Sequence, residues 1–238
     1  MAAQKEAGEG KQSESKKHDL ARLPKDWRER TFAATKPDPQ RPSRLATAVA
    51  LLWSTGCRPA ELEHGLQVQL VGGKQLVITI AGAKAGVIDN GQVKAKRGIE
   101  KRRLTIDANL NEATRYLAQL AATGPLKASY KRNSLRTRIN EIGRNVLAKM
   151  KLPPTLSPYS FRHAMGADLK SCDTLTDEER AQVMGHLAVD SLQSYGRRRR
   201  GGGGVSPVQK VWTSAQPVGG ISHGYTPPKP KPVAVLEA

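Results

Sequence analysis

Residues 44–62 read RLATAVALLWSTGCRPAEL, and this stretch decides how the chain folds. Its first twelve residues are apolar on nearly every side, which predicts a buried helix of about three turns. Gly56 can adopt the left-handed conformation that ends a helix, and Pro59 suits the first turn of the next one. That second helix, PAELEH, closes at Gly65. Arg58 therefore lies in a short turn between two helices.

The segments that follow combine strands with helices. Alternation in residues 66–82 predicts two strands around a Gly-Gly turn, and RRLTID at residues 102–107 predicts a third. Helical periodicity and capping residues then predict helices within residues 109–122, 134–150, 157–171, 176–185 and 188–196. The predicted fold class is α+β, mainly helical, with a small antiparallel β-sheet.

The charge of the chain points to a polyanionic partner. Its 238 residues carry 39 Lys and Arg against 21 Asp and Glu, a formal net charge of +18. Such an excess attracts phosphate backbones, although membrane surfaces and acidic proteins would also be attracted. No apolar run reaches the roughly 20 residues that span a bilayer, and Met1 leads into polar sequence. We expect a soluble protein of the cytoplasm.

Two cysteines, Cys57 and Cys172, are too few for a disulfide scaffold or a zinc quartet, so we expect both to be buried and no metal or cofactor to be bound. The composition also divides the chain. Residues 1–42 mix charges with Gly, Ser and Pro and predict a flexible basic arm with one short helix near residues 24–30. Residues 43–196 form the predicted domain, and residues 197–238 a basic, Gly- and Pro-rich tail.

Four segments of the domain, in order and suitably spaced, resemble the motifs of one family. TGCRPAEL (55–62) resembles the first arginine box of the tyrosine recombinases, or phage-type integrases. AGAKAG (81–86) and EKRRLTI (100–106) resemble the flanks of that family's lysine-bearing hairpin. SPYSFRHAMGADL (157–169) is similar to the second arginine box, and MGHLAVDSLQSYG (184–196) to the closing segment with its histidine and tyrosine. The resemblance implies a tyrosine recombinase catalytic domain over residues 43–196.

The implied activity is DNA strand cleavage by a tyrosine hydroxyl, which leaves a 3′-phosphotyrosyl link and a free 5′-hydroxyl. The resemblance assigns Tyr195 as the nucleophile and His186 as a hydrogen-bond donor to the phosphate. Arg58 and Arg162 would hold the non-bridging oxygens with their planar guanidinium groups. Lys84 would protonate the leaving oxygen, although other hairpin lysines compete for that role, at positions 94, 96 and 101.

The chain departs from the family pattern in two ways. The second box carries Tyr159 where the family usually has histidine, and a phenol donates to phosphate but is a weak base. His163 is next to Arg162, but one residue along a helix turns the side chain by about 100°. The N-terminal 42 residues are also too few to build the helical domain that often completes a clamp around DNA. Either the recombinase is short, or this is the catalytic part of a longer one.

The implied partners are double-stranded DNA and further copies of the chain, a tetramer on DNA, in mobile-element integration or excision. Arg197, Arg198, Arg199 and Arg200 are predicted to contact DNA backbone, and the protein to be associated with the nucleoid. We expect the tail to dock on a neighbouring protomer, with Val208, Val211 and Trp212 as its apolar anchor. Two rivals stay open: a DNA-binding regulator on the same fold without strand cleavage, and a general RNA- or DNA-coating protein.

Overall fold

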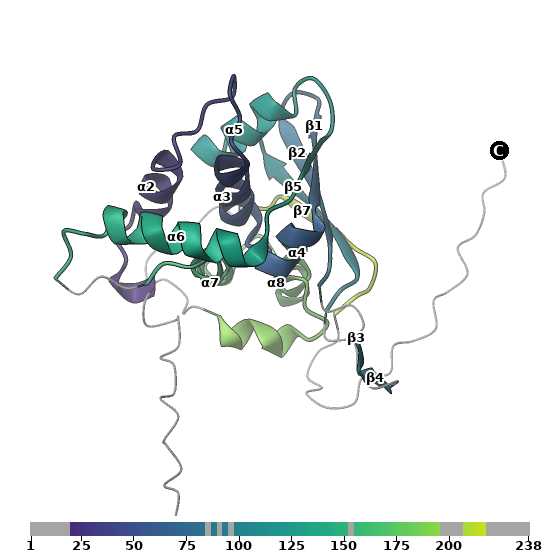
Figure 1. Ribbon diagram of the computed structural model, residues 1–238. Coiled ribbons are helices and arrows are strands. Elements are labelled where there is room, and N and C mark those ends of the chain that lie inside the picture. Colours follow the sequence, from purple (N-terminus) through teal and green to yellow (C-terminus); the bar gives the residue numbers. More distant parts are fainter. Residues whose placement is uncertain are drawn as a thin grey trace, which may run out of the picture.

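The computed structural model describes residues 20–83, 87–89, 92–94, 98–151, 155–195 and 207–217. They form an α+β fold, mainly helical, in which the helices gather on one side of a five-stranded antiparallel sheet (Figure 1). The predicted fold class is confirmed. None of the helices in these ranges is long and apolar enough to cross a membrane.

The sheet contains the three predicted strands and two further ones. The strand order is β6-β1-β2-β5-β7. The bounds are β1 Leu66–Val71, β2 Gln75–Ala81, β5 Lys101–Asp107, β6 Leu126–Ala128 and β7 Lys210–Thr213. Along β1, β2 and β5 buried and exposed residues alternate, so one face of the sheet meets the core. A separate two-stranded ribbon, β3 Val87–Asp89 and β4 Gln92–Lys94, projects from the β2–β5 connection (Figure 1).

The helices follow the predicted pattern closely. Their bounds are α2 Trp27–Ala33, α3 Arg44–Thr55, α4 Pro59–His64, α5 Glu112–Leu120, α6 Arg132–Val146, α7 Pro158–Lys170 and α8 Asp177–Met184, followed by a 3₁₀ helix, η1, at Val189–Ser194. α3 starts at Ser43, whose side chain accepts a hydrogen bond from the Ala46 amide, and it ends at Gly56 with φ of +58°.

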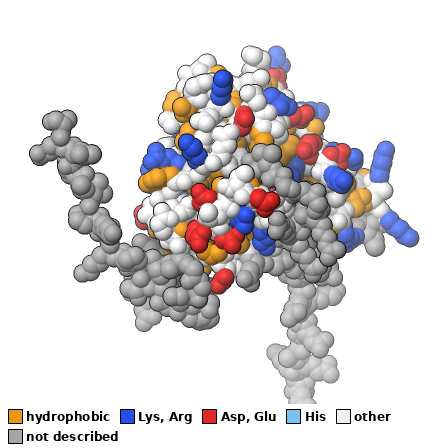
Figure 2. Space-filling model, turned by 180° about the vertical axis from the view of Figure 1, so that it is seen from behind, with side chains coloured by type: hydrophobic (Ala, Val, Ile, Leu, Met, Phe, Trp, Pro, Cys, Tyr) orange, Lys and Arg blue, Asp and Glu red, His pale blue; other side chains and the backbone are white. Residues whose placement is uncertain are grey.

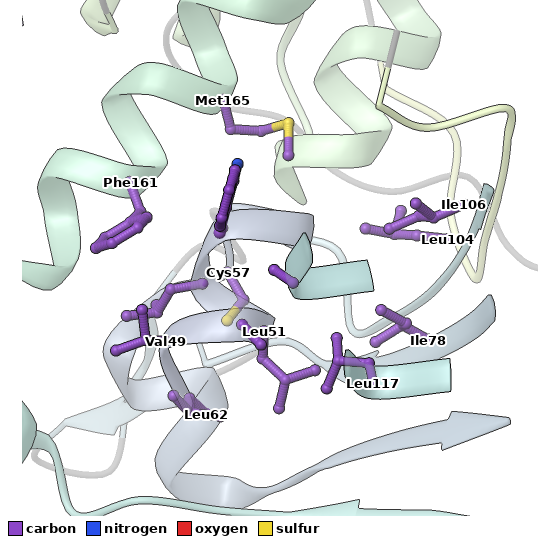
Figure 3. Close-up of a cluster of buried hydrophobic side chains, with 14 of the residues drawn as sticks. Val49, Leu51, Cys57, Leu62, Ile78, Leu104, Ile106, Leu117, Phe161 and Met165 are labelled. Carbon is purple, nitrogen blue, oxygen red and sulfur yellow. The ribbon is translucent and has the colours of Figure 1, made fainter. Parts of the chain in front are cut away.

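The hydrophobic core lies between α3, α7 and the inner face of the sheet (Figure 3). Leu51 of α3 and Phe161 of α7 are buried in it, together with Ile78 and Leu104 from the sheet. Both cysteines are buried, as expected, and neither forms a disulfide. Burial, with a smaller contribution from the charge of Glu61, raises the pKa of the Cys57 thiol to about 11.

The N-terminal segment differs from the predicted flexible arm. α2 packs into the core, with the Trp27 ring 4.7 Å from that of Phe161 and the Phe32 ring 5.6 Å from that of Tyr116. Arg28 also forms an ion pair of 2.6 Å with Asp168 of α7. Two buried aromatic side chains are sufficient to anchor a short helix, although so short a stretch shows little periodicity. Residues 1–19 lie outside the described part.

The tail also differs from the prediction, because it packs on its own chain. β7 pairs antiparallel with β5, placing Val211 opposite Leu104. Val208 is fully buried in the core of the same molecule, so this anchor does not need a neighbouring protomer. Trp212 is 47% exposed, and the Arg103 guanidinium lies 4.5 Å from its ring centre.

Candidate active site

The turn between α3 and α4 positions Arg58. Gly56 gives the turn its left-handed backbone, and a Cβ at this residue would lie 2.6 Å from the Cβ of Met165, so the turn rests directly on α7. Arg58 is the N-cap of α4, with extended backbone, and Pro59 begins the helix. The sequence thus fixes a buried arginine where two helices meet.

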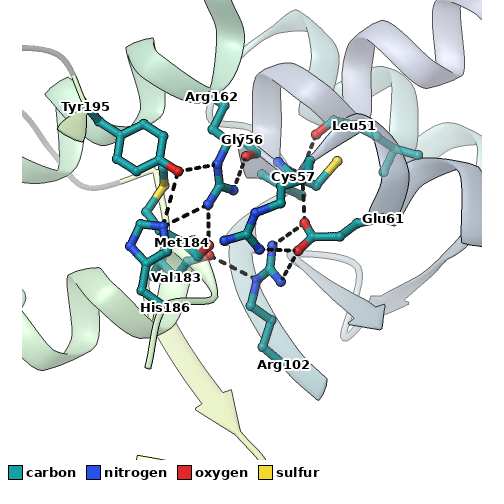
Figure 4. A network of polar contacts seen from close by, with 12 residues as sticks. Leu51, Gly56, Cys57, Glu61, Arg102, Arg162, Val183, Met184, His186 and Tyr195 are labelled. Carbon is teal, nitrogen blue, oxygen red and sulfur yellow. Dashed lines mark hydrogen bonds and ion pairs between the residues drawn. The ribbon is translucent and has the colours of Figure 1, made fainter. Parts of the chain in front are cut away.

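Glu61, one turn along α4, accepts hydrogen bonds from two arginines. Its Oε1 and Oε2 lie 2.7 Å from the Arg58 Nη1 and backbone nitrogen, respectively. Arg102 of β5 binds the same carboxylate in a bidentate manner, at 3.1 and 2.8 Å (Figure 4). Burial alone would raise the pKa of Glu61, but the charges and hydrogen bonds of Arg102, then the charge of Arg58, hold it well below its usual value. The carboxylate is therefore ionised.

Arg162 lies on α7, completely buried, and uses its guanidinium to join three segments. Nη1 donates to the carbonyl of Gly56 at 2.9 Å and Nη2 to that of Met184 at 2.6 Å. Nε donates to the Tyr195 hydroxyl at 3.1 Å (Figure 4). Burial, followed by repulsion from Arg58, lowers the pKa of Arg162. Three arginines face a single carboxylate here, so the cluster keeps an excess of positive charge.

The Tyr195 hydroxyl lies between Arg162 and His186. Its distance to Nε2 of His186 is 3.2 Å, and Nε2 is also 3.1 Å from Nη2 of Arg162. A guanidinium nitrogen can only donate, so Nε2 is an acceptor and the ring proton of His186 sits on Nδ1. The Tyr195 hydroxyl accepts from Arg162 and can donate its own proton to this imidazole.

His186 is held as the neutral imidazole. Burial, then the charges of Arg162 and Arg58, lowers the pKa of His186 to about 2. Gly185 ends α8 with φ of +68° and brings His186 back toward α7. The Tyr195 ring stacks on His186 with ring centres 5.2 Å apart, and His163 flanks it at the same distance. His186 with so low a pKa is a poor base, and it serves the half-buried Tyr195 hydroxyl as a hydrogen-bond acceptor.

The structure brings together four of the predicted site residues, namely Arg58, Arg162, His186 and Tyr195. Tyr159 is separate from them, because it lies in the first turn of α7 with 46% of its surface exposed. Lys84 and Arg197–Arg200 lie outside the described residues. Of the competing lysines, Lys101 is exposed at the start of β5, and the side chains of Lys94 and Lys96 are not described.

Sequence reasoning missed Arg102 and Glu61. A signal for Arg102 was present, because period-two alternation in KRRLTID places it on the same face as Leu104 and Ile106. Glu61 lies three residues after Arg58 on a helix that opens at Pro59, and a carboxylate there can cap the helix. In the described part of the chain, no group of three or more His, Cys, Asp or Glu side chains could hold a metal ion.

Comparison with known proteins gives one distant likeness to report. No protein-family model and no curated protein sequence matches the chain. A crystal structure of XerA recombinase is similar with a TM-score of 0.49 and 17% sequence identity. The match covers 75% of this chain and 60% of that one, so the chain spans about 60% of the length of that recombinase. We accordingly infer the function of the chain from its own residues.

Proposed function

We propose that this chain is a tyrosine-type site-specific DNA recombinase that cuts and rejoins DNA strands through a 3′-phosphotyrosyl intermediate. One observation carries the proposal: the Tyr195 hydroxyl lies 3.1 Å from Nε of Arg162 and 3.2 Å from Nε2 of a neutral His186. A phenol is a poor nucleophile until a base takes its proton or cations stabilise its anion. The Arg162 cation contacts this hydroxyl, and His186 orients it by accepting its hydrogen bond.

The chemistry follows from the charges around it. As Tyr195 attacks phosphorus, its hydroxyl proton leaves to solvent while Arg162 stabilises the negative charge on the phenol oxygen, and the bond to the 5′-oxygen breaks. Negative charge builds on the non-bridging phosphate oxygens, and arginines stabilise it best where water is excluded. Nη1 of Arg58 donates to Glu61. Within the described residues no other hydrogen bond involves the Arg58 guanidinium, so Nε and Nη2 can donate to the phosphate.

Lys84 remains our candidate for the acid that protonates the leaving 5′-oxygen, because it matches the hairpin lysine of the tyrosine recombinases. Rejoining reverses the steps when the 5′-hydroxyl of another strand attacks the phosphotyrosyl link. No high-energy cofactor is needed, since the link conserves the energy of the phosphodiester.

Double-stranded DNA is the proposed substrate, bound by a tetramer of this chain. The net charge of +18 supports a polyanionic partner. On the face in Figure 2, Lys and Arg side chains lie among Asp and Glu side chains, so positive and negative charges are interspersed on this face. Arg197–Arg200 directly follow the nucleophile segment and would add contacts to the backbone.

A second candidate is a DNA-binding regulator on the same fold that does not cleave. The exposed Tyr159 favours it, because the position that usually carries histidine in this box is neither basic nor in contact with the cluster around Tyr195. Its DNA binding would resemble that of the enzyme, so only covalent chemistry separates the two.

The test is incubation with duplex DNA nicked beside the scissile phosphate, which traps the cleaved state because the short 5′-product diffuses away. Candidate target sites are any repeated sequences that are found beside the gene. Wild type should shift the labelled strand on a denaturing gel, and Tyr195→Phe should not, although its DNA affinity stays within about threefold. DNA binding without adduct on every substrate would support the regulator instead.

A further inference from the structure

Arg102 has no part in the chemistry proposed above, yet it is the residue that joins the two halves of the site. Its side chain is 1% exposed and comes from β5, on the sheet side of the cluster. Buried arginines are rare unless their hydrogen bonds are satisfied. Arg102 satisfies its donors on two different elements.

The first is α4, through Glu61. Nη1 and Nη2 of Arg102 hold Oε1 and Oε2 of the carboxylate, while the other lone pairs accept from the Arg58 backbone and guanidinium. Four donors in fixed directions leave the Glu61 carboxylate a single orientation, and this orientation places Arg58 (Figure 4). Arg102 also offsets the negative charge of Glu61, so this carboxylate does not cancel the positive charge of Arg58.

The second is the end of α8, which His186 follows by two residues. Nε of Arg102 donates to the carbonyl of Val183 at 3.0 Å. A Cβ at Gly185 would lie 2.6 Å from Nη1, so the guanidinium packs directly on the turn before His186. The segment just before β5 is joined to this turn by backbone as well, because the Ile99 amide donates to the Gly185 carbonyl at 3.3 Å.

We infer that Arg102 is a positioning residue. It fixes the positions of Arg58 and His186 relative to each other, and so relative to a phosphate bound between them. The inference rests on the proposed function for its consequence in catalysis. The positioning itself is a property of the folded chain and can be measured without DNA.

The first measurement is cleavage at saturating DNA in a single turnover. In Arg102→Met, and to a smaller extent in Arg102→Lys, we expect the adduct to form about a hundredfold more slowly with DNA affinity little changed, since misplacement by about 1 Å has such an effect. The matched control is Arg103→Met, because Arg103 is the next residue on β5 and points to the exposed face. It should cleave like wild type.

A double variant separates positioning from folding. Arg102→Met leaves the Glu61 carboxylate without its main partner and is expected to destabilise the fold, so Arg102→Met/Glu61→Gln should regain stability. If Arg102 positions the site, this double variant should still cleave DNA slowly. If stability and cleavage both return to wild type, Arg102 serves only to neutralise a buried charge, and the inference is overturned.

The second measurement needs no activity. The Arg58 amide donates to Glu61, the His186 amide to Ala181, and the Gly56 amide to Leu52 within α3. In Arg102→Lys, hydrogen exchange at Arg58 and His186 should accelerate more than at Gly56, which reports overall stability. Equal acceleration at all three would refute positioning. If wild type forms no adduct, the proposed function fails and this exchange pattern alone decides the role of Arg102.

Discussion

Replacement of Gly166 by alanine should displace Tyr195, the proposed nucleophile, and leave its hydroxyl chemically unchanged. Gly166 lies in the middle of α7, and a Cβ there would be 2.7 Å from Cβ and 3.2 Å from Cγ of Tyr195. Ordinary carbon contacts are about 3.5–4.0 Å, so Tyr195 must move by about 1 Å. Such a shift separates its hydroxyl from Arg162 and His186, and a displacement of this size costs about a hundredfold in rate.

The effect on stability should be small by comparison. Alanine is favoured over glycine in a helix by about 1 kcal/mol, and this offsets part of the roughly 1–3 kcal/mol that overpacking costs. Gly166→Ala is therefore expected to lie within about 2 kcal/mol of wild type in urea unfolding, while its adduct forms about a hundredfold more slowly.

Gly143→Ala is the matched control. Gly143 is also a helical glycine whose Cβ would meet a side-chain Cβ at 2.7 Å, but the neighbour is Leu156 and not Tyr195. Both variants are assayed for single-turnover adduct formation on nicked duplex and for the urea midpoint. Wild-type cleavage by Gly166→Ala, or an equal loss in Gly143→Ala, would refute the placement of Tyr195 against α7.

Three further predictions concern proton linkage, the tail and salt. The pKa of His186 is about 2 in the folded chain against an ordinary 6.5, so below pH 6.5 the imidazole takes up a proton only in the unfolded chain. The contribution of His186 to the free energy of unfolding is therefore fully present above pH 6.5 and is lost as the pH falls. Between about pH 7 and pH 5, the free energy of unfolding from urea titrations should fall by about 2 kcal/mol more in wild type than in His186→Gln. Equal decreases in the two proteins would mean that His186 is not held neutral. Val208→Ala should cost about 2 kcal/mol at every protein concentration, since Val208 is buried within its own chain. A cost that shrinks on dilution would instead place the tail on a neighbour. DNA affinity measured by fluorescence anisotropy should fall about a thousandfold between about 50 and 200 mM salt for roughly six phosphate contacts. An affinity that hardly changes with salt would contradict binding dominated by the backbone.

Local pattern was sufficient for the elements that surround the site. The apolar run that ends at Gly56 gave α3 its observed bounds, and the Gly72-Gly73 turn gave the β1–β2 hairpin. These features are set by neighbours in sequence, such as a left-handed glycine or an alternating strand. The motif spacing likewise selected Arg58, Arg162, His186 and Tyr195, which the fold brings together.

What the sequence did not reveal depends on contacts between distant segments. Trp27 meets Phe161 across more than a hundred residues, and Val211 pairs with Leu104 after a glycine-rich stretch. Composition marked both segments as flexible, because a short anchored helix or strand hardly changes it. Arg102 was overlooked for another reason: a charged residue on the inward face of a strand is unusual, and its partners there, Glu61 and the Val183 carbonyl, lie far from it in the sequence.

The central claim is that Tyr195 is the nucleophile, and the most direct test is to identify the residue that carries the DNA. The adduct trapped on nicked duplex is digested with protease and nuclease, and the peptide bearing the nucleotide is sequenced by mass spectrometry. The account predicts a 3′-phosphotyrosyl link on Tyr195 in wild type and none in Tyr195→Phe. A link on Tyr159 or Tyr225, or undiminished adduct in Tyr195→Phe, would contradict it.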